Sequence, residues 1–228
     1  LGFSASQRNA GDISIPGKAW TDAYDELVNP RSFVPGVGIV ELENPDGKLA
    51  NSFHERSSLS FGGRVGSEEG FSLGASFQKV DQIYGIPYYF AGDATDLFGD
   101  LSIGAGLERG DLEMSNHFDP EAWLDKIELR FGMGRYKHEE IFDGRLKDEG
   151  KRFAETAFNK QAVESRLEFY FGEDTDWSGV FGAQFNDDDL AIERVVVPPP
   201  TLFKEASRIE SENLGLFSLN HWEYEQWV

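Results

Sequence analysis

Hydrophobic and polar residues alternate along much of the chain. In the stretch 124–140, the apolar residues from Ile127 to Met133 fall on one side of an extended strand, and ions and glycines fall on the other. A period of two predicts a strand with one apolar face and one wet face. The same pattern predicts seven further strands, at residues 1–9, 53–65, 71–84, 101–117, 161–171, 177–186 and 212–224.

One predicted strand, 101–117, changes parity along its length. Its apolar residues share one side up to Leu107 and the other side from Leu112 onward. A single inserted residue moves all later side chains to the opposite face of a strand. We therefore expect a β-bulge or a break near Arg109 and Gly110.

The connections between these strands alternate between short and long. Three are tight turns, at residues 66–70, 119–122 and 172–176. The others are polar, contain proline and glycine, and cover residues 9–52, 85–100, 137–160 and 187–211. Short turns at one end of a sheet and long loops at the other are typical of an outer-membrane β-barrel.

Tryptophans lie near the short turns. Trp123 and Trp177 each follow a short turn, and Trp222 and Trp227 fall where the next short turn is due. Indole is apolar with one polar N–H, so it favours the boundary between lipid and water. The predicted strands, about ten to fourteen residues long, match a tilted bilayer span better than the five or six residues of a β-sandwich strand.

Composition excludes several classes of function. The chain of 228 residues carries 41 acidic and 21 basic residues, a net charge of −20, and such a chain repels nucleic-acid phosphates. It contains no cysteine, which excludes disulfides and thiol nucleophiles. It also contains no apolar run long enough for a transmembrane helix. The chain opens on LGFSASQRN, which already alternates, and a chain that starts inside a strand is expected to be part of a longer polypeptide.

These patterns predict an all-β fold, a membrane-spanning antiparallel β-barrel whose apolar face contacts outer-membrane lipid. The opposite face then lines a lumen and carries many ions (Lys126, Glu128, Arg130, Glu164, Arg166 and Glu168). A small barrel fills its interior with side chains, whereas a large one leaves a polar lumen. We expect a large barrel, of which about eight strands form only an arc.

Several segments resemble the barrel of TonB-dependent outer-membrane receptors. They read KLANSFHERSSLSFGGRV, GFSLGASFQKVDQIYGIP, LRFGMGRYKHEEI and WSGVFGAQFNDDDLAI, followed by VVVPPPTLFKEASRIESENLGLFSLNHWEYEQW. The likeness covers residues 50–228, and it is loosely closest to the zinc-uptake receptor group. The outer loops of that group are rich in histidine, but the loop after Tyr84 contains none.

The resemblance implies a receptor of Gram-negative bacteria, located in the cell outer membrane. Residues 1–228 would form part of a barrel of about 22 strands, with long extracellular loops and with the plug domain absent from this chain. The receptor would import a scarce nutrient, such as a metal chelate, a siderophore or a similar small ligand. Its partners would be the remaining barrel, the plug and the TonB–ExbB–ExbD complex, with no cofactor.

Two groups of residues are candidate binding sites. Tyr84, Tyr88, Tyr89 and Phe90 lie in one outer loop, where they would stack on a sugar or an aromatic siderophore, or pack the loop against its neighbours. His138 and Glu140 share one side of a strand and are candidate ligands for a divalent metal. The alternative for this pair is that both belong to the framework of the strand.

Other features carry less chemistry. Asp187, Asp188 and Asp189 could supply oxygen ligands for calcium, but they lack the spacing of an EF-hand loop, so a hydrated loop is expected. No Ser/His/Asp grouping is present, and the sequence gives no support for an enzyme. Two alternatives to a receptor stay open, namely a passive porin or structural barrel, and a secreted β-sandwich adhesin.

Overall fold

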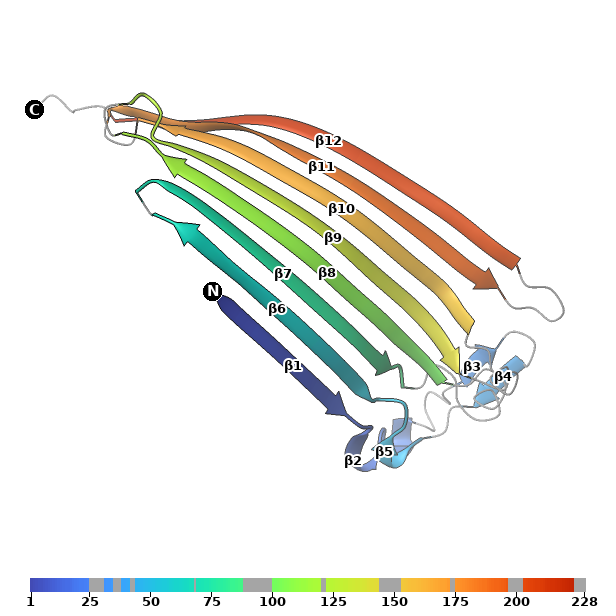
Figure 1. The fold of residues 1–228 in the computed structure, drawn as a ribbon. Coiled ribbons are helices and arrows are strands. Elements are labelled where there is room, and N and C mark those ends of the chain that lie inside the picture. Colours follow the sequence, from blue (N-terminus) through green and yellow to red (C-terminus); the bar gives the residue numbers. More distant parts are fainter. Residues whose placement is uncertain are drawn as a thin grey trace, which may run out of the picture.

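The alternating segments form strands that pair in one large antiparallel sheet (Figure 1). The computed structural model describes residues 1–24, 31–34, 38–41, 44–67, 69–87, 100–119, 122–143, 153–172, 175–196 and 203–223. The eight strands of the sheet are, in spatial order, β1 (Gly2–Ala10), β6 (His54–Gly66), β7 (Phe71–Gly85), β8 (Asp100–His117), β9 (Lys126–Asp143), β10 (Phe153–Phe171), β11 (Trp177–Val196) and β12 (Phe203–Trp222).

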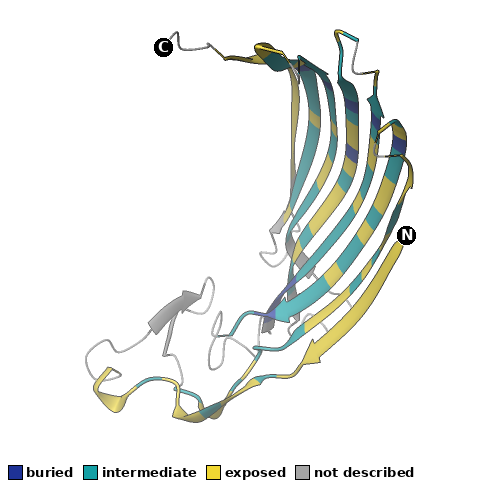
Figure 2. Cartoon of the chain, turned by 90° about the vertical axis from the view of Figure 1, so that its left-hand side faces the viewer, coloured by how far each residue is buried: buried dark blue, intermediate teal, exposed yellow. Residues whose placement is uncertain are grey.

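The sheet is a meander in which each strand pairs with the next. The exception is the step from β1 to β6, where the chain first forms two small two-stranded sheets. These pair β2 (Ile13–Lys18) with β5 (Asp46–Leu49) and β3 (Arg31–Val34) with β4 (Gly38–Glu41). β1 and β12 are the two edges of the sheet, which curves as a single layer (Figure 2). The predicted fold class is confirmed as one large antiparallel sheet consistent with a partial β-barrel.

No helix within the described ranges has the length and apolar character needed to cross a membrane.

The strands are longer than the alternation predicted. β8 to β12 contain 18 to 20 residues each, so strand occupies much of the predicted loops 137–160 and 187–211. The extra length carries polar residues on both faces, which removes the period of two. Ion pairs connect the side chains of neighbouring strands in these extensions, such as Lys160 of β10 with Asp188 of β11 at 2.8 Å.

The predicted bulge in β8 was wrong. Arg109 pairs with Gly134 and Gly110 pairs with Met133, and the register with β7 and β9 continues without a shift. The change of parity is instead a change in which face of the sheet is apolar. Beyond this level the neighbouring strands behave alike. Lys79 and Arg135 pair with Glu108 on the face that was apolar, whereas Val80 and Tyr136 pair with Leu107 on the opposite face.

The sheet has one apolar face that nothing in the described structure covers. We call its apolar residues the convex band. They include large side chains that are between about one third and four fifths exposed, from Phe131 at 37% to Leu216 at 82%. On the opposite face, Glu128 and Glu168 are only 4% exposed although no second layer covers them. Side chains converge on the inside of a curved sheet, so this opposite, ionic face is the concave one.

The convex band runs obliquely across the strands. Toward the long loops, the band ends at Leu59 on β6 and at Phe185 on β11. The residues paired in turn with Leu59 across the strands lead to Asp189 on β11, so the band has moved by four residues toward the short turns. The limit near the short turns moves by the same four residues, because the residues paired in turn with Phe71 of β7 lead to Phe181, whereas the band on β11 ends at Trp177. With about 3.4 Å per residue and about 4.8 Å between strands, the slope is roughly 30°, close to the tilt of barrel strands.

Candidate functional site

The concave face of β8, β9 and β10 carries a network of ion pairs, which we call the concave ionic cluster. Its members come from three neighbouring strands and are Arg109, Asp111, Lys126, Glu128, Arg130, Glu164, Arg166 and Glu168. Six of these lie in the segments where the alternation predicted ions facing a lumen. The sheet brings together residues that are more than fifty positions apart in the chain.

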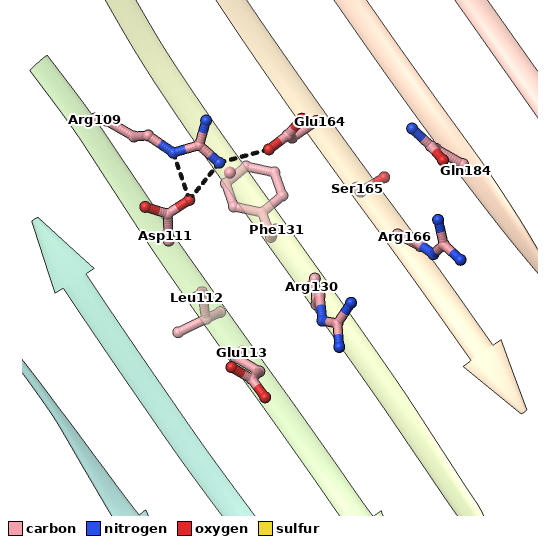
Figure 3. Close-up of a pocket in the computed structure, with 11 residues that line it drawn as sticks. Arg109, Asp111, Leu112, Glu113, Arg130, Phe131, Glu164, Ser165, Arg166 and Gln184 are labelled. Carbon is pink, nitrogen blue, oxygen red and sulfur yellow. Dashed lines mark hydrogen bonds and ion pairs between the residues drawn. The ribbon is translucent and has the colours of Figure 1, made fainter. Parts of the chain in front are cut away.

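Arg109 joins β8 to β10 across the strand between them (Figure 3). Its guanidinium donates to Asp111 at 2.8 Å and to Glu164 at 2.6 Å. Gly132 lies in the row between the two carboxylates. A Cβ at Gly132 would lie 2.9 Å from Glu164 Oε1 and 3.3 Å from the Arg109 guanidinium. The missing side chain therefore makes room for the bridge.

Glu128 and Glu168 face each other directly across β9 and β10. Two buried carboxylates in this position repel each other unless cations lie close. Lys126 lies 3.0 Å from Glu128, Arg166 lies 2.7 Å from Glu168, and Arg130 pairs with both. The acids are therefore neutralised by a row of bases next to them.

Two of these bases also contact aromatic rings. The Lys126 ammonium lies 4.2 Å from the centroid of Tyr170, and the Arg166 guanidinium lies 4.5 Å from that of Phe217. Cations over ring faces gain electrostatic stabilisation beyond their ion pairs. These contacts fix the cations on the wall and hold the acids beside them.

A shallow hollow lies beside the concave ionic cluster. It is lined by charged and amide side chains, among them Arg109, Glu113, Arg130, Glu164, Arg166 and Gln184 (Figure 3). The side chains of Arg109 and Arg130 are about half exposed. The hollow can hydrogen-bond a polar partner that carries both signs of charge. It presents no grouping of nucleophile, base and orienting acid.

A second polar group lies nearer the short turns. Arg64 donates to the Ser72 hydroxyl at 2.7 Å and to the Ser115 hydroxyl at 3.3 Å, and the two hydroxyls are 2.7 Å apart. Ser72 and Ser115 are almost fully buried. No local pattern predicts this group, because single serines in a strand are common and their partners come from other strands.

The structure places only part of the predicted aromatic group. Tyr84 lies at the outer end of β7 on the concave face, where its ring is 6.4 Å from that of His54. Tyr88, Tyr89 and Phe90 lie outside the described residues. A ligand site formed by these residues stays a prediction.

His138 and Glu140 share the concave face of β9, as the period of two requires. His138 Nδ1 is 3.2 Å from the Tyr136 hydroxyl, and its ring meets that of Phe158 edge-on at 5.6 Å. The described part of the chain contains no group of three or more His, Cys, Asp or Glu residues able to hold a metal ion. Metal binding at this pair also stays a prediction.

The three consecutive aspartates lie in β11 and not in a loop. They point to alternate faces, where Asp188 pairs with Lys160 at 2.8 Å and Asp189 pairs with Arg208 at 2.7 Å. The hydrogen bond from Arg208 lowers the pKa of the Asp189 carboxyl below its usual value. Asp188 and Asp189 are thus divided between separate cations on opposite faces and do not gather around one point.

A solved structure shares this architecture. The chain superposes on the ferric yersiniabactin uptake receptor FyuA from Yersinia pestis with a TM-score of 0.51 and 12% sequence identity. The shared fold is part of a β-barrel. The match covers 98% of this chain and 32% of the receptor, so the chain spans about a third of that protein's length. No protein-family model and no curated protein matches the chain.

Proposed function

We propose that the chain is part of the wall of a TonB-dependent receptor in the outer membrane of a Gram-negative bacterium. Its task would be the energised import of a scarce nutrient, such as a metal chelate, a siderophore or a similar small ligand. One observation carries the proposal. A single-layer sheet presents an uncovered apolar band on its convex face and a network of ions on its concave face.

The convex band fits a lipid environment. A large uncovered apolar patch is unfavourable in water but is solvated by lipid chains. On β10 the band extends from Val163 to Phe171, roughly 27 Å along the strand. Tilted by about 40°, it would span roughly 20 Å of membrane, comparable with the apolar height of outer-membrane barrels.

Aromatic residues lie at the short-turn end of the band. Trp177 and Trp222 pair across β11 and β12, with ring centroids 5.5 Å apart, and both are about half exposed or more. Phe171 lies 4.9 Å from Trp177. This group supports a membrane interface at the side of the short turns, which is the periplasmic side in outer-membrane barrels.

The concave ionic cluster supports a polar lumen and a protein occupant. Arg109 and Glu164 are half exposed and carry opposite charges, so they can exchange partners with a polypeptide segment of mixed charge. We propose that this occupant is the plug of the same receptor, and that the free edges of β1 and β12 pair with the remaining barrel strands. TonB–ExbB–ExbD would supply the energy that moves the plug.

The outer end of the concave face is the proposed region for cargo. Tyr84, Tyr136 and His138 present ring-bearing side chains there. They could stack on or hydrogen-bond a small ligand, together with the predicted aromatics Tyr88, Tyr89 and Phe90, and His138 with Glu140 could contribute to metal recognition.

A growth experiment tests the transport proposal. Strains lacking the full-length gene, lacking TonB, or lacking both would be grown with one iron chelate, zinc, cobalamin or a glycan as the limiting nutrient. The proposal predicts one nutrient for which the two single deletions fail alike and the double deletion fails no further. Growth that depends on the gene but not on TonB would instead support a passive porin.

Fractionation tests the membrane location separately. The full-length protein should sediment with outer membranes and need detergent for extraction. Release in soluble form without detergent would contradict the barrel and support an adhesin, although the described strands form no second large sheet of the kind a β-sandwich requires.

A further inference from the structure

The buried hydrophobic residues of the described part of the chain lie at the outer end of the sheet, where the long loops begin. Leu101 and Ile103, at the start of β8, are only 5% and 7% exposed, and Gly85 at the end of β7 is buried as well. The chain segment that leads from β5 into β6 packs here, and Asn51 of that segment contacts both Leu101 of β8 and Ile86, the residue that follows β7.

Asn51 holds both sides of the β7–β8 connection. Its amide nitrogen donates to the carbonyl of Ile86 at 2.9 Å and to the carbonyl of Leu101 at 2.7 Å. An amide group has two N–H donors, and both are used. Ile86 follows β7 and Leu101 belongs to β8, and they are also joined by a backbone hydrogen bond of 2.9 Å. One side chain therefore closes the base of the β7–β8 loop.

The backbone is adapted to this contact on both sides. Asn51 has a φ of 53°, in the left-handed region where asparagine is among the few tolerated side chains. A Cβ at Gly85 would lie 2.3 Å from Asn51 Oδ1 and 2.4 Å from its carbonyl oxygen. The Gly85 N–H donates to the carbonyl of Phe53 at 2.9 Å. Asn51 can therefore approach this closely because Gly85 has no side chain.

Ser52, the residue after Asn51, holds the end of the first outer loop, residues 11–53, against its start. Ser52 receives a hydrogen bond from the Ile13 N–H on its hydroxyl, at 2.7 Å, and its own N–H donates to Asp12 at 2.9 Å. Asp12 also pairs with Lys48 at 3.1 Å. These contacts tie the start of the loop at residues 11–53 to its end, beside the β2–β5 pair that lies beyond β1 and β6 (Figure 1).

We propose that Asn51, Ser52 and Gly85 form a clamp that fixes the first outer loop to the rim of the wall. The clamp gives the loop at residues 11–53 and the β7–β8 loop one common rigid base. Loops that bind ligands depend on such a scaffold to hold their side chains in place. The inference rests on the fold alone and holds whether or not the protein transports a nutrient.

Hydrogen exchange of the full-length protein in detergent tests the clamp. Asn51→Gly keeps the left-handed backbone and removes the amide, whereas Asn51→Asp keeps the size and removes the donors. Asn213→Asp is the matched control, because Asn213 donates only to the exposed Ser211 hydroxyl on β12. Gly85→Ala attacks the same contact from the opposite side and covers the case in which one Asn51 variant does not fold.

Both Asn51 variants and Gly85→Ala should speed exchange in the peptides around residues 11–18, 46–53 and 85–87 by about tenfold or more, the loss expected for two hydrogen bonds. Exchange in β9 and β10 should stay at the level of the unmodified protein, as it should everywhere outside β12 in Asn213→Asp. Unchanged exchange of the loop base in Asn51→Gly would show that Asn51 serves only its backbone conformation and would overturn the clamp. Equal acceleration of β9 would overturn it too, because the residue would then stabilise the whole wall.

Discussion

A charge placed in the middle of the convex band tests which solvent that face contacts. Leu129 lies near the middle of the band on β9, between Met114 on β8 and Leu167 on β10. The change Leu129→Arg therefore puts a guanidinium among apolar neighbours, two residues inside the limit at Ile127 and four residues inside the limit at Met133.

The structure sets the size and the sign of the effect. If the band faces lipid, an arginine near the bilayer midplane should cost about 2–4 kcal/mol of folding free energy. If the band faces water, a surface substitution of this kind should change the stability by roughly 0.5 kcal/mol or less. The matched control is Gln161→Arg, on the same face but outside the band, where Gln161 pairs with Arg135 and Asp189.

The assay is reversible folding of the purified full-length protein into lipid vesicles over a urea series. Tryptophan fluorescence and heat-dependent mobility on gels would follow the folded fraction. Leu129→Arg should lose at least about 2 kcal/mol relative to Gln161→Arg. Equal stability of the two variants would refute a lipid-facing band, and with it the membrane orientation of the wall.

Three further changes test separate parts of the wall. Gly132→Val should displace Glu164 from Arg109 and cost about 1–3 kcal/mol of folding free energy through overpacking, measured in the same vesicle assay. Gly134→Ala should be nearly neutral, because the nearest atom to a Cβ there is 3.7 Å away. Equal costs of the two changes would contradict this account. Because the pKa of Asp189 is lowered, its pair with Arg208 stabilises the fold above the ordinary aspartate pKa, and this contribution is lost as the pH falls below about 4. Carboxyl NMR should show the Asp189 titration moving to higher pH in Arg208→Gln. No movement would contradict the pairing. Emission of Trp177 and Trp222 should be quenched more by lipids brominated near the headgroup than by lipids brominated near the chain end, since both residues lie at one limit of the band, and the reverse order would place that limit deep in the membrane.

The eight strands, and the faces of those that keep one parity, were predictable from the sequence because alternation is local. Each residue's side of a strand follows from its own position, so Ile127 and Arg130 could be assigned to opposite faces without any partner. The short turns were equally visible, since glycine and acidic residues interrupt the pattern. The outer ends of β9 to β12 were missed, because there polar and apolar residues are mixed on both faces and the period of two disappears.

The exchange of faces in β8 and the contacts between distant residues were decided only by the tertiary structure. The change of parity in β8 has two local explanations, and only an unbroken register with both neighbours shows that the faces exchange character without a bulge. Arg109 and Glu164 meet across Gly132 because three strands align there, and Asn51 reaches Leu101 because the first outer loop returns to the rim. Such contacts join residues about fifty positions apart, and a local pattern contains no information about which distant residue will lie alongside.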